Sequence, residues 1–206
     1  MNNKKLVSLT FDDGPNTTTT MQVLDLIEQY GITASFYVVG NNINSESEAA
    51  MKRAVKLGCE IENHSQTHSV MTEMTAEQIA EEIKYTSDKI EAVTGRKPKF
   101  FRPPYIAYNE LMYDTIDLTF ICGNGAEDYL DEVTAEMRYE KIMAQVCDGM
   151  IILLHDAEGN FRTVDALKLL IPKLLEEGYE FVTTTELFER NAVTPDHRSI
   201  YTNVHQ

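Results

Sequence analysis

The chain has 206 residues, and its 18 lysines and arginines against 33 aspartates and glutamates give a formal net charge of −15. This length suits one domain with its own hydrophobic core, and 43% hydrophobic with 25% charged residues excludes a disordered or collagen-like chain. A surface this acidic repels phosphate groups, so we expect no nucleic-acid partner, and no apolar run is long enough for membrane insertion.

Short β-like runs alternate with amphipathic helical runs along the chain. In chain order we predict strand 6–11, helix 21–30, strand 34–39, helix 46–57, strand 59–63, helix 75–94, strands 100–101 and 118–122, helix 134–146, strand 150–154, helix 164–177 with a kink near Pro172, strand 181–185 and helix 185–190. About seven such units predict a parallel sheet covered by helices, either open and doubly wound or closed into a (β/α) barrel. The tail after Arg190 has no strong pattern.

The start of the chain and its cysteines bear on its cellular setting. The first five residues lead directly into a strand-like run without a signal-peptide apolar region, so we expect a cytoplasmic protein or a catalytic domain cut from a longer chain. Cys59, Cys122 and Cys147 are odd in number and far apart, which predicts buried free thiols rather than disulfides or a cysteine-zinc site. No sequence feature indicates an oligomeric state.

Ionisable side chains directly follow four of the predicted strands. They are Asp12, Asp13, His64, His68, Arg102 and His155. Because the carboxyl ends of parallel strands meet on one face of the sheet, we expect these side chains to share one rim. Each has a plainer alternative, since the aspartates suit a solvated turn, the first two histidines a surface pair, the arginine a helix cap and the last histidine a buried core position.

Taken together, these side chains can form one catalytic site. Two histidines and one aspartate give a divalent transition metal three ligands and leave positions open for water and substrate. The spacing of His64 and His68 places both imidazoles on one face of a helical turn. A free carboxylate can take a proton from water, and a separate histidine can protonate a leaving group, so the set predicts metal-assisted hydrolysis.

Four motifs in this order resemble those of the polysaccharide deacetylases with a NodB-homology domain, carbohydrate esterase family four. They are TFDDGP at 10–15, HSQTH at 64–68, RPPY at 102–105 and LLHD at 153–156. The resemblance implies one catalytic domain over residues 1–206, with its core at about 5–190. It also implies a distorted (β/α) barrel with about seven parallel strands, and an activity that removes acetyl groups from carbohydrate polymers.

Carried over position by position, the resemblance assigns roles to individual residues. It implies a metal triad of Asp13, His64 and His68, with Zn²⁺ as the expected ion and Co²⁺ or Ni²⁺ as alternatives. Asp12 would be the catalytic base, and Arg102 would orient it and keep it ionised. The backbone N–H of Tyr105 would stabilise the oxyanion together with the metal.

The other half of the implied site surrounds His155, which would be the general acid. The family pattern pairs this histidine with an aspartate that is followed by tryptophan, but the chain has no tryptophan. The nearest match is Asp128 followed by Tyr129, with Glu127 as a competitor for the aspartate's role and a plain acidic loop as the alternative. Leu153 would line the pocket for the acetyl methyl group, with Tyr129 in the tryptophan position.

The resemblance leaves the acetylated polymer open. We favour N-deacetylation of N-acetylglucosamine residues in peptidoglycan or chitin-like oligomers, with O-deacetylation of acetylated xylan as the alternative. Such substrates imply a secreted or cell-envelope-facing protein. A non-catalytic carbohydrate-binding relic is disfavoured because base, acid and ligands are all present. A phosphotransfer enzyme with Asp12 as nucleophile is disfavoured because no basic or glycine-rich phosphate cradle follows the first strand.

Overall fold

The computed structural model describes residues 4–206. Its strands are β1 (Lys5–Asp12), β2 (Ser35–Val38), β3 (Glu60–Asn63), β4 (Phe100–Phe101), β5 (Thr119–Ile121), β6 (Asn124–Gly125), β7 (Met150–His155), β8 (Tyr179–Phe181) and β9 (Ile200–Tyr201). Its α-helices are α1 (Thr19–Tyr30), α2 (Glu48–Lys56), α3 (Ala76–Thr94), α4 (Glu110–Thr115), α5 (Ala135–Met143), α6 (Phe161–Glu176) and α7 (Thr184–Arg190).

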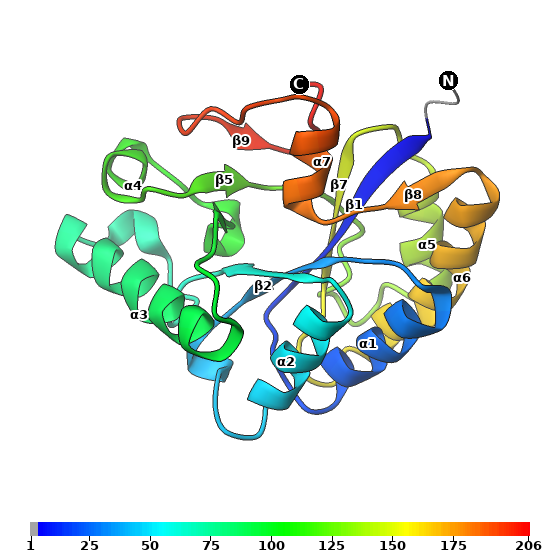
Figure 1. The fold of residues 1–206 in the computed structure, drawn as a ribbon, viewed down its shortest axis with the longest axis horizontal. Helices are drawn as coiled ribbons and strands as arrows, with labels where there is room; N and C mark the ends of the chain where they lie inside the picture. Colours follow the sequence, from blue (N-terminus) through cyan, green and yellow to red (C-terminus); the bar gives the residue numbers. More distant parts are fainter. Residues whose placement is uncertain (1–3) are drawn as a thin grey trace.

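The strands form one curled parallel sheet in the order β6-β7-β1-β2-β3-β4-β5-β9, and β8 pairs with the first half of β1. The strands β8 and β2 therefore share one edge of β1. Lys5 at the start of β1 lies opposite Tyr179 of β8, and Thr10 near its end lies opposite Ser35 of β2. Helices α1, α2, α3, α5 and α6 lie around the outside of the sheet, whereas α7 lies among the strands, where Leu187 and Phe188 join a second hydrophobic core inside the barrel (Figure 1). The expected distorted (β/α) barrel is thus confirmed, with nine strands among residues 4–206 in place of about seven.

The alternation of side chains along β1 explains how the fold builds a site. Val7, Leu9 and Phe11 belong to the large hydrophobic core shared with the covering helices. The intervening residues, which are Leu6, Ser8, Thr10 and Asp12, point into the barrel because neighbouring side chains of a strand face opposite ways. This inward row becomes polar toward the carboxyl end of β1, where the catalytic groups are expected.

Local signals predicted most helix ends correctly. Thr75 and Gln78 form the expected capping box, and Gly95 ends α3 in the left-handed conformation with a φ of 73°. Pro172 lies inside α6 without ending it. The predicted strand 181–185 was placed too late, because β8 ends at Phe181 and Thr183 already caps α7.

The tail after Arg190 has more structure than the sequence predicts. It contains β9, which pairs in parallel with β5, and Asn203 then forms an antiparallel bridge with Met150 of β7. The tail thereby lies between β5 and β7. Tyr201 is buried in the second hydrophobic core, which also contains Leu6, Leu187 and Phe188. The expected core of about 5–190 therefore leaves out a strand that helps to close the sheet.

Two further sequence expectations concern the cysteines and the membrane. All three cysteines are free thiols, but only Cys59 is buried, while Cys122 is half-buried and Cys147 is exposed. Among residues 4–206, no helix combines the length and apolar character that crossing a membrane requires.

Candidate active site

The carboxyl ends of four strands bring the predicted residues to one rim. Asp12 ends β1, His64 follows β3, Arg102 follows β4 and His155 ends β7. A cleft of about 630 Å³ opens at this rim and is lined by both aspartates and all three strand-end histidines. Asp12 lies directly opposite His155 in the β1–β7 register, so the expected base and acid come from neighbouring positions on paired strands.

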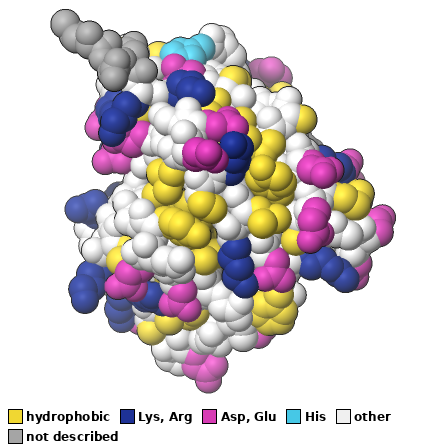
Figure 2. Space-filling view, turned by 90° about the vertical axis from the view of Figure 1, so that its right-hand side faces the viewer, with side chains coloured by type: hydrophobic (Ala, Val, Ile, Leu, Met, Phe, Trp, Pro, Cys, Tyr) yellow, Lys and Arg dark blue, Asp and Glu magenta, His cyan; other side chains and the backbone are white. Residues whose placement is uncertain are grey.

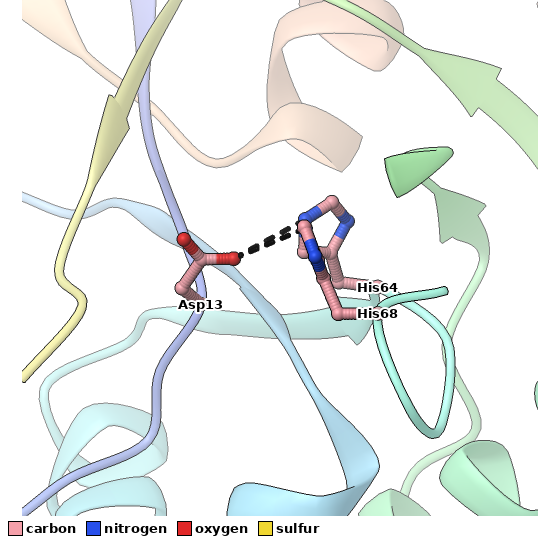
Figure 3. A group of neighbouring side chains, drawn as sticks. All are labelled: Asp13, His64 and His68. Carbon is pink, nitrogen blue, oxygen red and sulfur yellow. Dashed lines mark ion pairs between the residues drawn. The ribbon is translucent and has the colours of Figure 1, made fainter. Parts of the chain in front are cut away.

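Asp13, His64 and His68 point toward one another within the cleft (Figure 3). Asp13 Oδ1 lies 3.5 Å from His64 Nε2 and 3.4 Å from His68 Nε2, and the three potential ligand atoms all lie within 4.8 Å of one another. The Nδ1–H of His64 donates to the carbonyl oxygen of Arg102 at 2.7 Å, which leaves Nε2 free to face Asp13. This is the usual orientation of a metal-ligating histidine.

The two histidines do not lie on a helical turn, so that part of the sequence argument was wrong. The segment between them is a loop in which Ser65 and His68 both have left-handed backbone conformations. Ser65 donates its N–H to Asn63 Oδ1 at 2.8 Å and accepts from the N–H of His68 at 3.0 Å. These side-chain contacts hold the loop in the shape that brings the imidazoles together.

The electrostatics of the triad suit a divalent cation. Burial raises the pKa of Asp13, but the hydrogen bond with His64 and the charges of the nearby histidines outweigh burial and lower the pKa to about 2. Burial and the charge of His64 lower the pKa of His68. A carboxylate and neutral imidazoles are the protonation states that ligate a metal, and this donor set fits Zn²⁺, Co²⁺ or Ni²⁺.

Arg102 fixes one oxygen of Asp12 and leaves the other facing the triad. Its Nη1 lies 2.5 Å from Asp12 Oδ1, and its Nη2 donates to Thr10 Oγ1 at 2.9 Å. The guanidinium is fully buried, and its Cζ lies 4.1 Å from the centroid of the Tyr37 ring, so a cation–π contact with Tyr37 stabilises its charge. Asp12 Oδ2 lies 3.7 Å from His64 Nε2.

At the end of β7, beside Asp12 in the register, Asp128 holds His155. The Nδ1–H of His155 donates to Asp128 Oδ1 at 2.7 Å, and its backbone N–H donates to Oδ2 at 2.8 Å. Glu127 instead forms an exposed ion pair with Lys141. Burial lowers the pKa of His155, but the hydrogen bond and charge of Asp128, with the charges of Asp12 and Asp13, raise the pKa to about 9.

The remaining predicted residues line the walls of the cleft. Tyr105 and Tyr129 are each 66% exposed, and Leu153 is almost completely buried. Within residues 4–206 the backbone N–H of Tyr105 donates to no acceptor, while the following N–H of Ile106 donates to the carbonyl of Pro103. The Tyr129 ring lies edge-on to His155, with ring centroids 5.7 Å apart.

The sequence analysis missed several residues that support the site. The ring of Tyr37 packs against the guanidinium of Arg102 in a cation–π contact, and the hydroxyl of Thr163 donates to Asp128 Oδ2 at 2.7 Å. Asp156, which the sequence marked only as the neighbour of His155, accepts from the N–H of Gly14 and from the hydroxyl of Thr20. Burial and the charges of Asp13 and Asp12 raise the Asp156 pKa to about 7, despite these hydrogen bonds. The position of Asp156 after a predicted strand could have indicated a role in the site, but no sequence pattern indicates Tyr37 or Thr163.

Comparisons with known proteins agree with the family that the sequence motifs indicate. A family profile described as polysaccharide deacetylase matches residues 1–120. The chain is 46% identical to the bifunctional xylanase/deacetylase of Pseudobutyrivibrio xylanivorans over 98% of its own length, but spans only 34% of that protein. It is 35% identical to the peptidoglycan-N-acetylmuramic acid deacetylase PdaC of Bacillus subtilis over 91% of its own length and 39% of the relative's.

A solved structure extends the likeness to three dimensions. The family 4 acetyl xylan esterase of Clostridium thermocellum, in complex with a cobalt ion, superposes with a TM-score of 0.95 at 42% identity and covers 98% of this chain and 100% of that chain. The sequence resemblance to carbohydrate esterase family four is thus confirmed. The chain belongs to the polysaccharide deacetylase family.

Proposed function

We propose that the chain is a metal-dependent hydrolase that removes acetyl groups from a polysaccharide. The observation that carries this proposal is the position of Asp12 and His155, which lie opposite each other on paired strands and line one cleft with the triad. In this proposal Asp13, His64 and His68 hold one divalent ion, with Zn²⁺ as the expected metal. When bound, the ion supplies a Lewis acid that polarises the acetyl carbonyl and the attacking water.

The protein groups then divide the proton transfers between them. Asp12 takes a proton from the water through Oδ2, because Arg102 occupies Oδ1. The oxygen of the water joins the acetyl carbon, and the free N–H of Tyr105 donates to the resulting oxyanion. His155, whose pKa of about 9 keeps it protonated at neutral pH, gives its proton to the leaving oxygen or nitrogen as the bond to the acetyl carbon breaks.

O-acetylated xylan is the first candidate substrate, because the relatives at 42% and 46% identity are named an acetyl xylan esterase and a xylanase/deacetylase. N-acetylglucosamine polymers are the second, because an amine leaving group needs a proton more than an alcohol does and His155 can supply one. In either case Leu153 and Tyr129 would accommodate the acetyl methyl group. Both polymers belong outside the cytoplasm, so we propose a secreted or envelope-facing location.

Acetate release tests this function directly. The chelated protein is assayed on acetylated xylan, N-acetylglucosamine oligomers and peptidoglycan, with and without added Zn²⁺ or Co²⁺. We expect metal-dependent acetate release from xylan or from the oligomers. A protein that retains no metal and releases no acetate would instead be a carbohydrate-binding relic, and metal-dependent turnover of phosphate esters alone would support the phosphotransfer alternative.

A further inference from the structure

A second, polar pocket lies beside the catalytic cleft. It has a volume of about 230 Å³, and Asp13 lines both cavities. Its other walls come from the loops after β1, β2 and β7, including Thr17, Asn41, Glu46 and Glu158. At roughly 30 Å³ for each water molecule, the pocket of about 230 Å³ holds about eight waters that a ligand can displace.

Several polar groups in this pocket have no partner within the described chain. Asn41 uses its Oδ1 to accept from Gln66, which leaves its NH₂ donors free. Asn42 uses its NH₂ to donate to the carbonyl oxygen of Asp13 at 2.7 Å, which leaves Oδ1 free. Thr17 adds an exposed hydroxyl, so the pocket offers both donors and acceptors. Sugar hydroxyl groups, which donate and accept at once, match such a mixed wall.

The charges of this pocket favour an uncharged ligand. Among residues 4–206, the linings of the pocket and the cleft contain no lysine or arginine, whereas Glu46 and Glu158 are exposed carboxylates without an ion-pair partner. On the face shown in Figure 2, by contrast, basic side chains are interspersed among the acidic ones. A carboxylate on a sugar would therefore meet the like charges of Glu46 and Glu158 in this pocket, with no lysine or arginine in its lining to offset them.

We propose that this asparagine pocket, defined by Thr17, Asn41, Asn42, Glu46 and Glu158, is a sugar subsite. It takes an uncharged unit of the same polysaccharide whose acetyl group reaches the triad, and it rests on the deacetylase function proposed above. Asp13 lines both the subsite and the catalytic cleft, so the two cavities are adjacent and a longer substrate would occupy both.

Substrate length tests the subsite. Acetate release is measured on acetylated oligosaccharides of increasing length with wild type, with Thr17→Trp, which fills the pocket, and with Glu81→Trp on the exposed face of α3 as a matched control. We expect wild type and control to gain kcat/KM with length. The ratio of long to short substrate should fall about two- to tenfold in Thr17→Trp, as for the loss of one neutral hydrogen bond or more.

The ratio is taken within one preparation, so a partly unfolded variant does not bias it. A wild type without any gain from length, or a Thr17→Trp variant that keeps the whole gain, overturns the subsite. Release of no acetate from any substrate overturns the proposed function instead.

Charge gives the second test. Wild type, the Glu46→Gln/Glu158→Gln double variant and a Glu81→Gln control are compared on one acetylated oligosaccharide with and without a uronic acid substituent. We expect wild type and control to prefer the uncharged form severalfold in dilute buffer, and to lose that preference at about 1 M salt, where the Debye length is about 3 Å. The double variant should show little preference at any salt concentration. Equal, salt-independent rates in wild type would refute selection for an uncharged unit.

Discussion

Replacing Asp128 with asparagine tests how the site keeps His155, the proposed general acid, protonated. Asp128 is almost completely buried and accepts two hydrogen bonds from His155, so the substitution removes the counter-charge while keeping the size of the side chain. The pKa of His155, at about 9, lies about 2.5 units above the ordinary value of 6.5, which corresponds to about 3 kcal/mol. Without the carboxylate, burial lowers the pKa back toward 6.5, because the charges of Asp12 and Asp13, which still raise it, have smaller effects than Asp128.

The expected effect is large at mildly alkaline pH and small at acidic pH. At pH 8, a histidine with a pKa of about 9 is about 90% protonated, whereas one with a pKa of 6.5 is about 3% protonated. Asp128→Asn should therefore shift the basic limb of the kcat/KM profile down by two units or more, with about thirtyfold less activity at pH 8.

The assay is acetate release between pH 5 and pH 10, with both proteins loaded with the same metal so that the charge of the ion affects both alike. Glu127→Gln is the matched control, because Glu127 pairs with Lys141 and should leave the limb in place. An unmoved basic limb in Asp128→Asn would refute the role of Asp128, and a limb that moves in Glu127→Gln would transfer that role to Glu127.

Three other substitutions test the remaining parts of the site. Asp12→Asn keeps the shape but removes the base, so turnover should fall by about 10² to 10⁴ while metal content by elemental analysis stays unchanged; full turnover would exclude Asp12 as the base. His68→Ala should weaken metal affinity by more than about tenfold after dialysis, and unchanged occupancy would contradict the triad. Asp156→Ala leaves the buried N–H of Gly14 without its acceptor, so the free energy of unfolding in urea should fall by about 1–3 kcal/mol. A loss within experimental error would mean that water replaces the carboxylate.

Stability also has a pH dependence that follows from His155. Its folded-state pKa of about 9 exceeds the unfolded value of 6.5, so folding stabilises the protonated form. The contribution is complete below pH 6.5 and is lost as the pH rises through 9. Denaturant titrations should therefore show wild type losing up to about 3 kcal/mol over this window relative to Asp128→Asn. Parallel pH curves for the two proteins would contradict the raised pKa.

The fold could be predicted wherever local patterns decide it. The apolar runs of β1 and β7 and the capping box at Thr75 are readable from neighbouring residues. The two-residue strands β6 and β9 are not, because they are defined only by pairing with distant strands. The helix α4 is short, and its cap at Asn109 is the only strong local signal for it.

The candidate site was predictable to the extent that strand ends determine it. The rule that strand carboxyl ends share one face brought Asp12, His64 and His155 together correctly. The choice between Glu127 and Asp128 could not be made from the sequence, because adjacent residues differ only in which way they face. That direction depends on Thr163 and on the backbone of His155, which arrive from later segments to surround Asp128.

The backbone conformation of the rim could not be predicted from the sequence either, because it also depends on contacts with distant segments. Seven non-glycine residues in the described chain have positive φ, and six of them lie at or beside the catalytic cleft: Asp13, Ser65, His68, Tyr105, Ile106 and Glu127. Each such conformation costs about 1–3 kcal/mol, so propensity alone predicts against it. The surrounding contacts must outweigh this cost, as Ser65 does for the histidine loop and Asn42 for the carbonyl of Asp13. The strained backbone of the rim is therefore a product of the tertiary fold, which gathers the catalytic groups at positions that local sequence disfavours.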